Sequence, residues 1–203
     1  MTYAPHPIFI LSEWADDIEG ILNWLGMYEF APESSFISWI GHQICNVESS
    51  PDLADVCANL AFAFLGFNPD QFNKTMIPVY LDHVPAGTAT RPIVHYAQLH
   101  TYDSEFKKFD FGSAEKNMEH YGSPDPPYYN LDNVKTPVAL WSADKDYLAD
   151  SKDVYHLSRV LPNVISYELV NIPGFTHLDF AMAIDADIAI YKPLIDMMNK
   201  SFS

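Results

Sequence analysis

The clearest hydrophobic pattern in the sequence lies between residues 136 and 180. Two short apolar runs, residues 136–141 and 164–170, carry the β-branched and aromatic side chains that favour buried strands. Between them, Asp150 has the position of a helix N-cap, and apolar residues follow it at helical spacing, at Val154, Leu157, Val160 and Leu161. The pattern therefore predicts a strand, a helix and a second strand, with the two strands parallel and joined by a crossover connection.

Polar residues follow both predicted strands at the point where each strand ends. Asp146 lies in the loop after the first strand, and His177 lies in the loop after the second. Because parallel strands end at the same edge of a sheet, we expect the two side chains to converge there, where open α/β folds bind ligands. A carboxylate that orients an imidazole, which then acts as a general base, needs this convergence.

Other interpretations of these residues stay open at this point. Asp144 could replace Asp146 as the orienting acid on spacing alone, whereas Asp150 is better explained as the helix cap. His177 and Asp179 could hold a metal together with Asp144 or Asp146, but no second histidine lies nearby at ligand spacing. In an unrelated cytosolic α/β protein, Asp146 and His177 would be structural residues.

The sequence around this unit is predicted to be mainly helical. Residues 3–11 resemble the end of a strand or its exit loop. Helices are expected to begin at Ser12, Ser50 and Thr90, the third reaching about Lys107, with a final helix over residues 178–198 and irregular structure over the Pro-, Gly- and Tyr-rich residues 109–133. The two or three strands expected after residue 131 need neighbouring strands to form a stable sheet.

Composition narrows the range of partners. The chain has 203 residues, of which 48% are hydrophobic, so it can bury a core. It has 11 Lys and Arg residues against 27 Asp and Glu residues, for a formal charge of -16, and no basic cluster is longer than Lys107-Lys108. We therefore expect no nucleic-acid partner. No apolar run is long enough for a transmembrane segment, and the N-terminus lacks the features of a signal peptide, which taken alone implies a cytosolic protein.

Two features favour a secreted or lumenal protein instead. Cys45 and Cys57 are the only cysteines, and one local disulfide across the acidic loop between them would use both. Asn73 and Asn199 each begin a glycosylation sequon. Sequons also arise by chance, and two reduced cysteines are common in cytosolic proteins, so both interpretations stay open.

The sequence contains no Gly-x-Ser-x-Gly motif and no Gly-rich phosphate-binding loop. In an α/β-hydrolase the nucleophile, the acid and the histidine follow one another in that order, and the nucleophilic serine lies on an earlier turn between a strand and a helix. Asp146 and His177 occur in that order here. The segment that should carry the nucleophile would lie before Met1.

Several segments, taken together, resemble one family over nearly the whole chain. They are residues 64–68 (FLGFN), 79–88 (VYLDHVPAGT), 109–113 (FDFGS), 117–122 (NMEHYG), 126–129 (PPYY), 145–150 (KDYLAD) and 177–180 (HLDF). In this order they resemble the C-terminal half of the acid lipase family, which contains gastric and lysosomal acid lipases and has the α/β-hydrolase fold.

The resemblance implies a fold and a set of site residues. It places the acid of a catalytic triad at Asp146, rather than Asp144, and the triad histidine at His177. It implies a partial α/β-hydrolase fold, in which residues 1–11 end a core strand, residues 12–131 form a mostly helical cap, and residues 132–203 form the last parallel strands and helices of the sheet. The family's cap disulfide matches Cys45 and Cys57. Its members are secreted or lysosomal glycoproteins that hydrolyse triacylglycerols and cholesteryl esters, with no metal or organic cofactor.

The missing nucleophile sets the expectation for activity. The family's serine turn, its oxyanion-hole loop and its first strands have no counterpart in these 203 residues. We therefore expect a truncated chain that does not hydrolyse esters by itself and that would act on lipid esters only with an N-terminal hydrolase half. The alternative is a non-catalytic protein, a decoy or lipid-binding fragment that kept acid-lipase surfaces without the chemistry.

Overall fold

The computed structural model describes residues 29–30, 68–83, 86–101 and 105–201. The chain divides into two compact units, one formed by residues 1–34 and 84–133 and the other by residues 35–83 and 134–203. The helices predicted from Ser12 and Ser50, the segment before residue 12, and both cysteines lie outside the described residues. In the described part of the chain, no helix is both long and apolar enough to cross a membrane.

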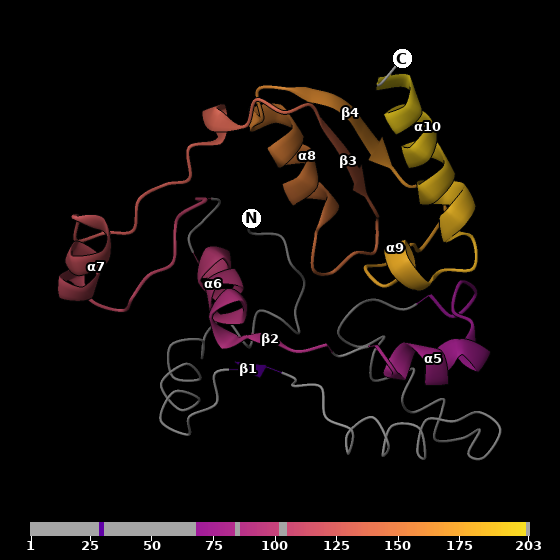
Figure 1. The fold of residues 1–203 in the computed structure, drawn as a ribbon, viewed down its shortest axis with the longest axis horizontal. Coiled ribbons are helices and arrows are strands. Elements are labelled where there is room, and N and C mark those ends of the chain that lie inside the picture. The colour runs from indigo at the N-terminus through magenta and orange to yellow at the C-terminus, as the bar shows by residue number, and fades with distance from the viewer. Residues whose placement is uncertain (1–28, 31–67, 84–85, 102–104, 202–203) are drawn as a thin grey trace. The chain divides into compact units, whose positions relative to one another are not determined.

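The predicted strand–helix–strand unit is confirmed in the second compact unit. Strand β3 (Val138–Ser142), helix α8 (Ser151–Val160) and strand β4 (Val164–Leu169) follow one another, and the two strands pair in parallel (Figure 1). Helix α8 contacts both strands. Asp150 caps the helix as predicted, since its Oδ1 accepts a hydrogen bond of 2.8 Å from the backbone N–H of Lys152.

The core of this unit includes the residues that directly follow the carboxyl ends of β3 and β4. Ala143, Val170, Phe175 and Ile190 form a buried cluster, and the Phe175 side chain is fully buried. The ring of Phe180 meets that of Phe175 edge-on, with the ring centres 5.3 Å apart. Because Phe175 comes two residues before His177, the core fixes the start of the loop that carries this histidine.

The single helix predicted over residues 178–198 is wrong. The structure has helix α9 (Asp179–Met182), a π-helix (Asp187–Tyr191) and helix α10 (Lys192–Ser201). Ala183 ends the first of them in an extended conformation and pairs with Phe72 in an antiparallel bridge. The next residue, Ile184, donates its backbone N–H to the Gln71 carbonyl at 3.0 Å. Pairing with a distant segment therefore interrupts the helix.

That distant segment contains two short helical turns. A 3₁₀-helix (Lys74–Met76) is capped by Asn73, and helix α5 (Ile77–Leu81) follows it directly. The hydroxyl of Tyr80 donates to the carbonyl of Met182 at 3.3 Å, which adds a further contact to the α9 region.

The first compact unit contains helix α6 (Thr90–Thr101), which begins where predicted. Its predicted end near Lys107 is wrong, because Lys107 pairs with Tyr128 in an antiparallel bridge and the N–H of Lys108 donates to the carbonyl of Pro127 at 2.9 Å. Strand β1 (Glu29–Phe30) pairs antiparallel with β2 (Thr88–Ala89), just before this helix.

Residues 109–133 are more regular than predicted, because they contain helix α7 (Ala114–Tyr121) and a 3₁₀-helix (Leu131–Asn133). Ser113 caps the start of α7, and Gly122 ends it in the left-handed conformation, with φ of 72°. The Pro and Tyr residues that suggested irregular structure lie mostly after this helix. The two cap residues were the better signal.

Candidate active site

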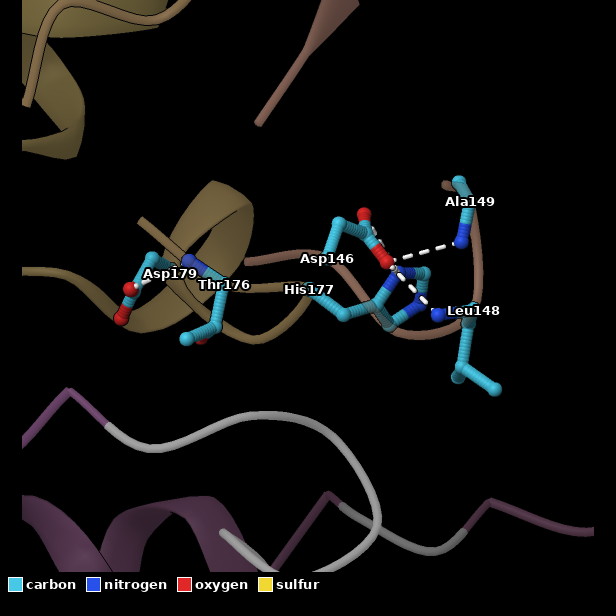
Figure 2. Close-up of polar contacts among 6 residues, drawn as sticks. All are labelled: Asp146, Leu148, Ala149, Thr176, His177 and Asp179. Carbon is cyan, nitrogen blue, oxygen red and sulfur yellow. Dashed lines mark hydrogen bonds and ion pairs between the residues drawn. The ribbon is translucent and has the colours of Figure 1, made fainter. Parts of the chain in front are cut away.

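The loops after β3 and β4 continue the parallel pairing of the strands. Lys145 pairs with Thr176 in a parallel bridge, and the backbone N–H of Lys145 donates to the Phe175 carbonyl at 3.1 Å. The next residue in each loop is Asp146 in one and His177 in the other. The sheet register therefore places these two residues side by side, as Figure 2 shows.

The two side chains form a close acid–imidazole pair. Nδ1 of His177 lies 3.1 Å from both carboxylate oxygens of Asp146. An ionised carboxylate can only accept hydrogen bonds, so Nδ1 carries the proton in this pair. The side chain of Asp146 is 3% exposed, whereas that of His177 is 41% exposed. With Nδ1 committed to the buried acid, Nε2 is the nitrogen left to exchange protons with another group.

The buried carboxylate of Asp146 is held by the backbone of its own loop as well. Oδ1 accepts the N–H groups of Leu148 at 2.9 Å and Ala149 at 2.7 Å (Figure 2). Burial acts to raise the pKa of Asp146, but the hydrogen bonds from His177, Ala149 and Leu148 outweigh it, so the pKa lies below its ordinary value of 3.8. The carboxylate is therefore ionised at neutral and mildly acidic pH and can stabilise an imidazolium beside it.

This lowered pKa predicts a pH-dependent contribution to stability. A carboxyl group whose pKa is lower in the folded than in the unfolded state stabilises the folded protein. This stabilisation is fully present at pH values above the ordinary pKa of 3.8, and it is lost as the pH falls through the lower pKa of the folded state. Replacing Asp146 by Asn should therefore lower the free energy of unfolding by about 1–3 kcal/mol at neutral pH, and this difference should shrink below about pH 4.

Urea denaturation of both proteins across a pH series measures this difference. Asp144→Asn is the matched control, because Asp144 is an exposed carboxylate in the same loop. A difference between wild type and Asp146→Asn that stays constant from about pH 7 to about pH 3 would contradict the assignment of a stabilised, ionised carboxylate.

A third acidic residue, Asp179, holds the histidine loop. Its Oδ2 accepts the backbone N–H of Thr176 and the side-chain amide of Asn68, both at 2.8 Å. Sequence reasoning assigned no role to Asn68 or to Asp179 beyond the metal alternative. The spacing Thr176-x-x-Asp179, which resembles a helix capping box, was the available signal for Asp179.

The metal alternative finds no geometric support in this region. In Figure 2 the carboxylate of Asp179 is directed to the backbone N–H of Thr176 and lies apart from the pair formed by Asp146 and His177. No group of three or more His, Cys, Asp or Glu side chains suited to a metal ion occurs within the described ranges.

The remaining predicted site residues lie elsewhere. Asp144, the alternative acid, is exposed, and both hydrogen bonds of the His177 ring go to Asp146. Asn73 and Asn199 are exposed, and Oδ1 of Asn73 accepts hydrogen bonds from the hydroxyl and the N–H of Thr75.

Comparison with known proteins finds lipases among the relatives of this chain. No family model matches the chain. The chain is 37% identical to human lysosomal acid lipase/cholesteryl ester hydrolase over 200 residues, which cover 98% of this chain and 48% of that protein. It is 35% identical over 200 residues to the same enzyme of Rattus norvegicus, covering 98% of the chain and 48% of the relative. With human gastric triacylglycerol lipase the identity is 36% over 171 residues, 84% of this chain and 42% of that protein.

The chain thus spans about half the length of the curated relatives that it matches. The similarity extends over almost all of its 203 residues, and the lysosomal and gastric enzymes match it at nearly equal identity. The chain belongs to the acid lipase family.

Proposed function

We propose that this chain is the part of a lipase-like carboxylic ester hydrolase that supplies the acid and the histidine of its catalytic triad. The observation that carries the proposal is the contact of 3.1 Å between Nδ1 of His177 and the buried carboxylate of Asp146. Family membership supports it, since the names of two relatives describe a cholesteryl ester hydrolase and a triacylglycerol lipase.

In this proposal each residue has a defined role. Nε2 of His177 removes the proton of a serine hydroxyl while the serine oxygen attacks the ester carbonyl, and the imidazole then gives the proton to the departing alcohol. Water then attacks the acyl group on the serine with the same help from His177, which releases the fatty acid and restores the serine. Asp146 keeps the proton on Nδ1 and stabilises the imidazolium. The serine belongs to a segment outside these 203 residues, which contain no Gly-x-Ser-x-Gly motif.

The substrate class and the cellular setting follow from the family. We propose a lipid ester as substrate, a secreted or lysosomal location, and a helical cap over residues 12–131 that precedes the C-terminal part, residues 132–203. A disulfide between Cys45 and Cys57 and glycans on Asn73 and Asn199 belong to the same proposal. The exposure of both asparagines supports the glycans, because a modifying enzyme must reach its acceptor.

The test uses a chimera in which this chain replaces the matching part of human lysosomal acid lipase/cholesteryl ester hydrolase. The rest of that enzyme should supply the nucleophile. We expect the chimera to hydrolyse a short-chain and a long-chain ester at mildly acidic pH, and the 203-residue chain alone to hydrolyse neither. A folded chimera without activity would contradict the proposed function. Activity of the chain alone that His177→Ala abolishes would instead locate a nucleophile within these residues.

A second candidate function is a non-catalytic lipid-binding or decoy protein. The observation that favours it is the absence of a Gly-x-Ser-x-Gly motif from the sequence. Binding of the chain to triacylglycerol emulsions, combined with an inactive chimera, would favour this candidate over the hydrolase.

A further inference from the structure

We propose that Asp179, anchored by Asn68, is the positioning residue that holds His177 against Asp146. The inference rests on the proposed function and deepens it, because it names the residues outside the acid–imidazole pair on which the pair depends. The hydrogen bonds of the His177 ring go to Asp146, so the effect of Asp179 and Asn68 on catalysis passes through the backbone of the loop.

The argument begins with the turn that contains the histidine. The Asp179 carboxylate accepts the backbone N–H of Thr176 at 2.8 Å, and the backbone N–H of Asp179 donates to the Thr176 carbonyl at 3.2 Å. These two bonds close residues 176–179 into one turn that leads into α9, whose first residue is Asp179. His177 is the second residue of that turn, so its backbone is fixed from both sides.

The carboxylate is itself held from a distant part of the chain. The side-chain amide of Asn68 donates to Oδ2 of Asp179 at 2.8 Å, across 111 positions of sequence. Asn68, Thr176 and Asp179 are 7%, 1% and 3% exposed. A buried carboxylate is costly unless it is hydrogen-bonded, so losing either donor penalises the closed turn. The geometry of the turn therefore depends on how the segment that contains Asn68 is packed.

A neighbouring contact shows that Asp179 is not needed merely to attach the segment around Asn68 to the segment around Asp179. Gln71 donates to Oδ2 of Asp185 at 2.9 Å and accepts the backbone N–H of Asp185 at 3.1 Å. This amide–carboxylate pair joins the same two stretches of chain, and Asp185 lies outside the turn. The stretches are therefore already tied together without Asp179, whose additional bond goes to the residue before the histidine.

The histidine needs such support because the ring itself has few restraints of its own. Its side chain is 41% exposed, and its hydrogen bonds are made by Nδ1 alone, to Asp146. The position of the ring therefore depends on the backbone that carries it. A displacement of about 1 Å in a catalytic group can lower the rate about a hundredfold.

The experiment compares Asp179→Ala with the matched control Asp185→Ala in the chimera. We expect Asp179→Ala to lower kcat for a short-chain ester about a hundredfold with little change in KM, because the substitution displaces the general base and leaves substrate binding intact. Asp185→Ala should reduce thermal stability and leave kcat near the value of the unmutated chimera. Asp179→Asn should retain most of the activity, because its amide oxygen can accept both hydrogen bonds.

A second readout does not depend on ester hydrolysis. Proton NMR of the 203-residue chain should show an Nδ1–H resonance of His177, identified by its absence in His177→Ala. We expect this resonance to persist in Asp185→Ala and to disappear in Asp179→Ala through exchange with water. If Asp179→Ala does not fold, Asn68→Ala takes its place and should speed the exchange about tenfold.

The outcomes separate this inference from the proposed function. An unmutated chimera without activity would contradict the function alone, and the NMR comparison would still decide the positioning role. Asp179→Ala with unchanged kcat and an unchanged Nδ1–H resonance would overturn the inference. Equal losses in Asp179→Ala and Asp185→Ala would also overturn it, since both residues would then act only through stability.

Discussion

Replacing His177 by Ala should lower kcat/KM of the chimera for a short-chain ester by about 10⁴-fold or more, because it removes the group that accepts the nucleophile's proton. The ring is 41% exposed, so the loss of its packing contributes little to the effect. Rates are measured with saturating and limiting ester. A chimera that loses less than about tenfold would exclude His177 as the general base.

Asp146→Asn should lower the same rate by about 10⁴-fold, because an Asn amide does not fix the Nδ1 proton or stabilise the imidazolium. The matched control is Asp144→Asn, a change of the same chemistry at an exposed position two residues earlier. The control should keep nearly full activity. A larger loss in Asp144→Asn than in Asp146→Asn would reverse the choice of acid.

The largest effect on stability is expected from Phe175→Ala. Phe175 is fully buried in the cluster with Ala143, Val170 and Ile190, and its ring meets Phe180 edge-on. Removing a buried phenyl ring takes away its apolar burial and leaves a cavity, which costs about 3–5 kcal/mol. Urea denaturation should show this loss as a lower midpoint with an unchanged slope.

The control for this stability prediction is Ile188→Ala, which truncates a side chain that is 61% exposed. It should change the free energy of unfolding by no more than about 0.5 kcal/mol. Similar losses in Phe175→Ala and Ile188→Ala would mean that the cluster around Phe175 is not the core of this unit. A loss in Phe175→Ala under about 1 kcal/mol would lead to the same conclusion.

The sequence predicts the central unit well because each of its signals is local. The apolar runs that became β3 and β4, and the cap at Asp150 before α8, are all read from neighbouring residues. Parallel pairing then follows from the order of the elements. The meeting of Asp146 and His177 follows from parallel pairing, since both loops leave the same edge of the sheet.

The break of the C-terminal helix at Ala183 could not be predicted from local pattern, whereas Pro193 was a local signal for the start of α10. Residues 184, 188, 191 and 195 have helical spacing, and the sequence contains no proline or glycine between residues 178 and 192 to mark a break. The break comes from Phe72, which pairs with Ala183 across 111 positions of sequence. Contacts at this separation have no signature in a single sequence, and tertiary pairing overrides helix propensity.

The hydrogen bonds that support the histidine loop could be predicted only in part from the sequence. Thr176-x-x-Asp179 has the spacing of a capping box, so the bond from the Thr176 N–H to Asp179 could have been predicted. The other donor, Asn68, could not, because nothing near it in the sequence indicates that it reaches a carboxylate 111 residues away.

Helix α7 was missed for another reason. Its caps, Ser113 and Gly122, were outweighed by the surrounding Pro, Gly and Tyr residues.

The central claim is that Asp146 and His177 act as one acid–imidazole pair in ester hydrolysis. The most direct test measures kcat/KM of four chimeras, carrying the unmutated chain, Asp146→Asn, His177→Ala and both changes. Because Asp146 acts only through the imidazole, the double variant should be no slower than His177→Ala alone. Losses that multiply in the double variant would show that the two residues contribute independently, and would contradict the claim.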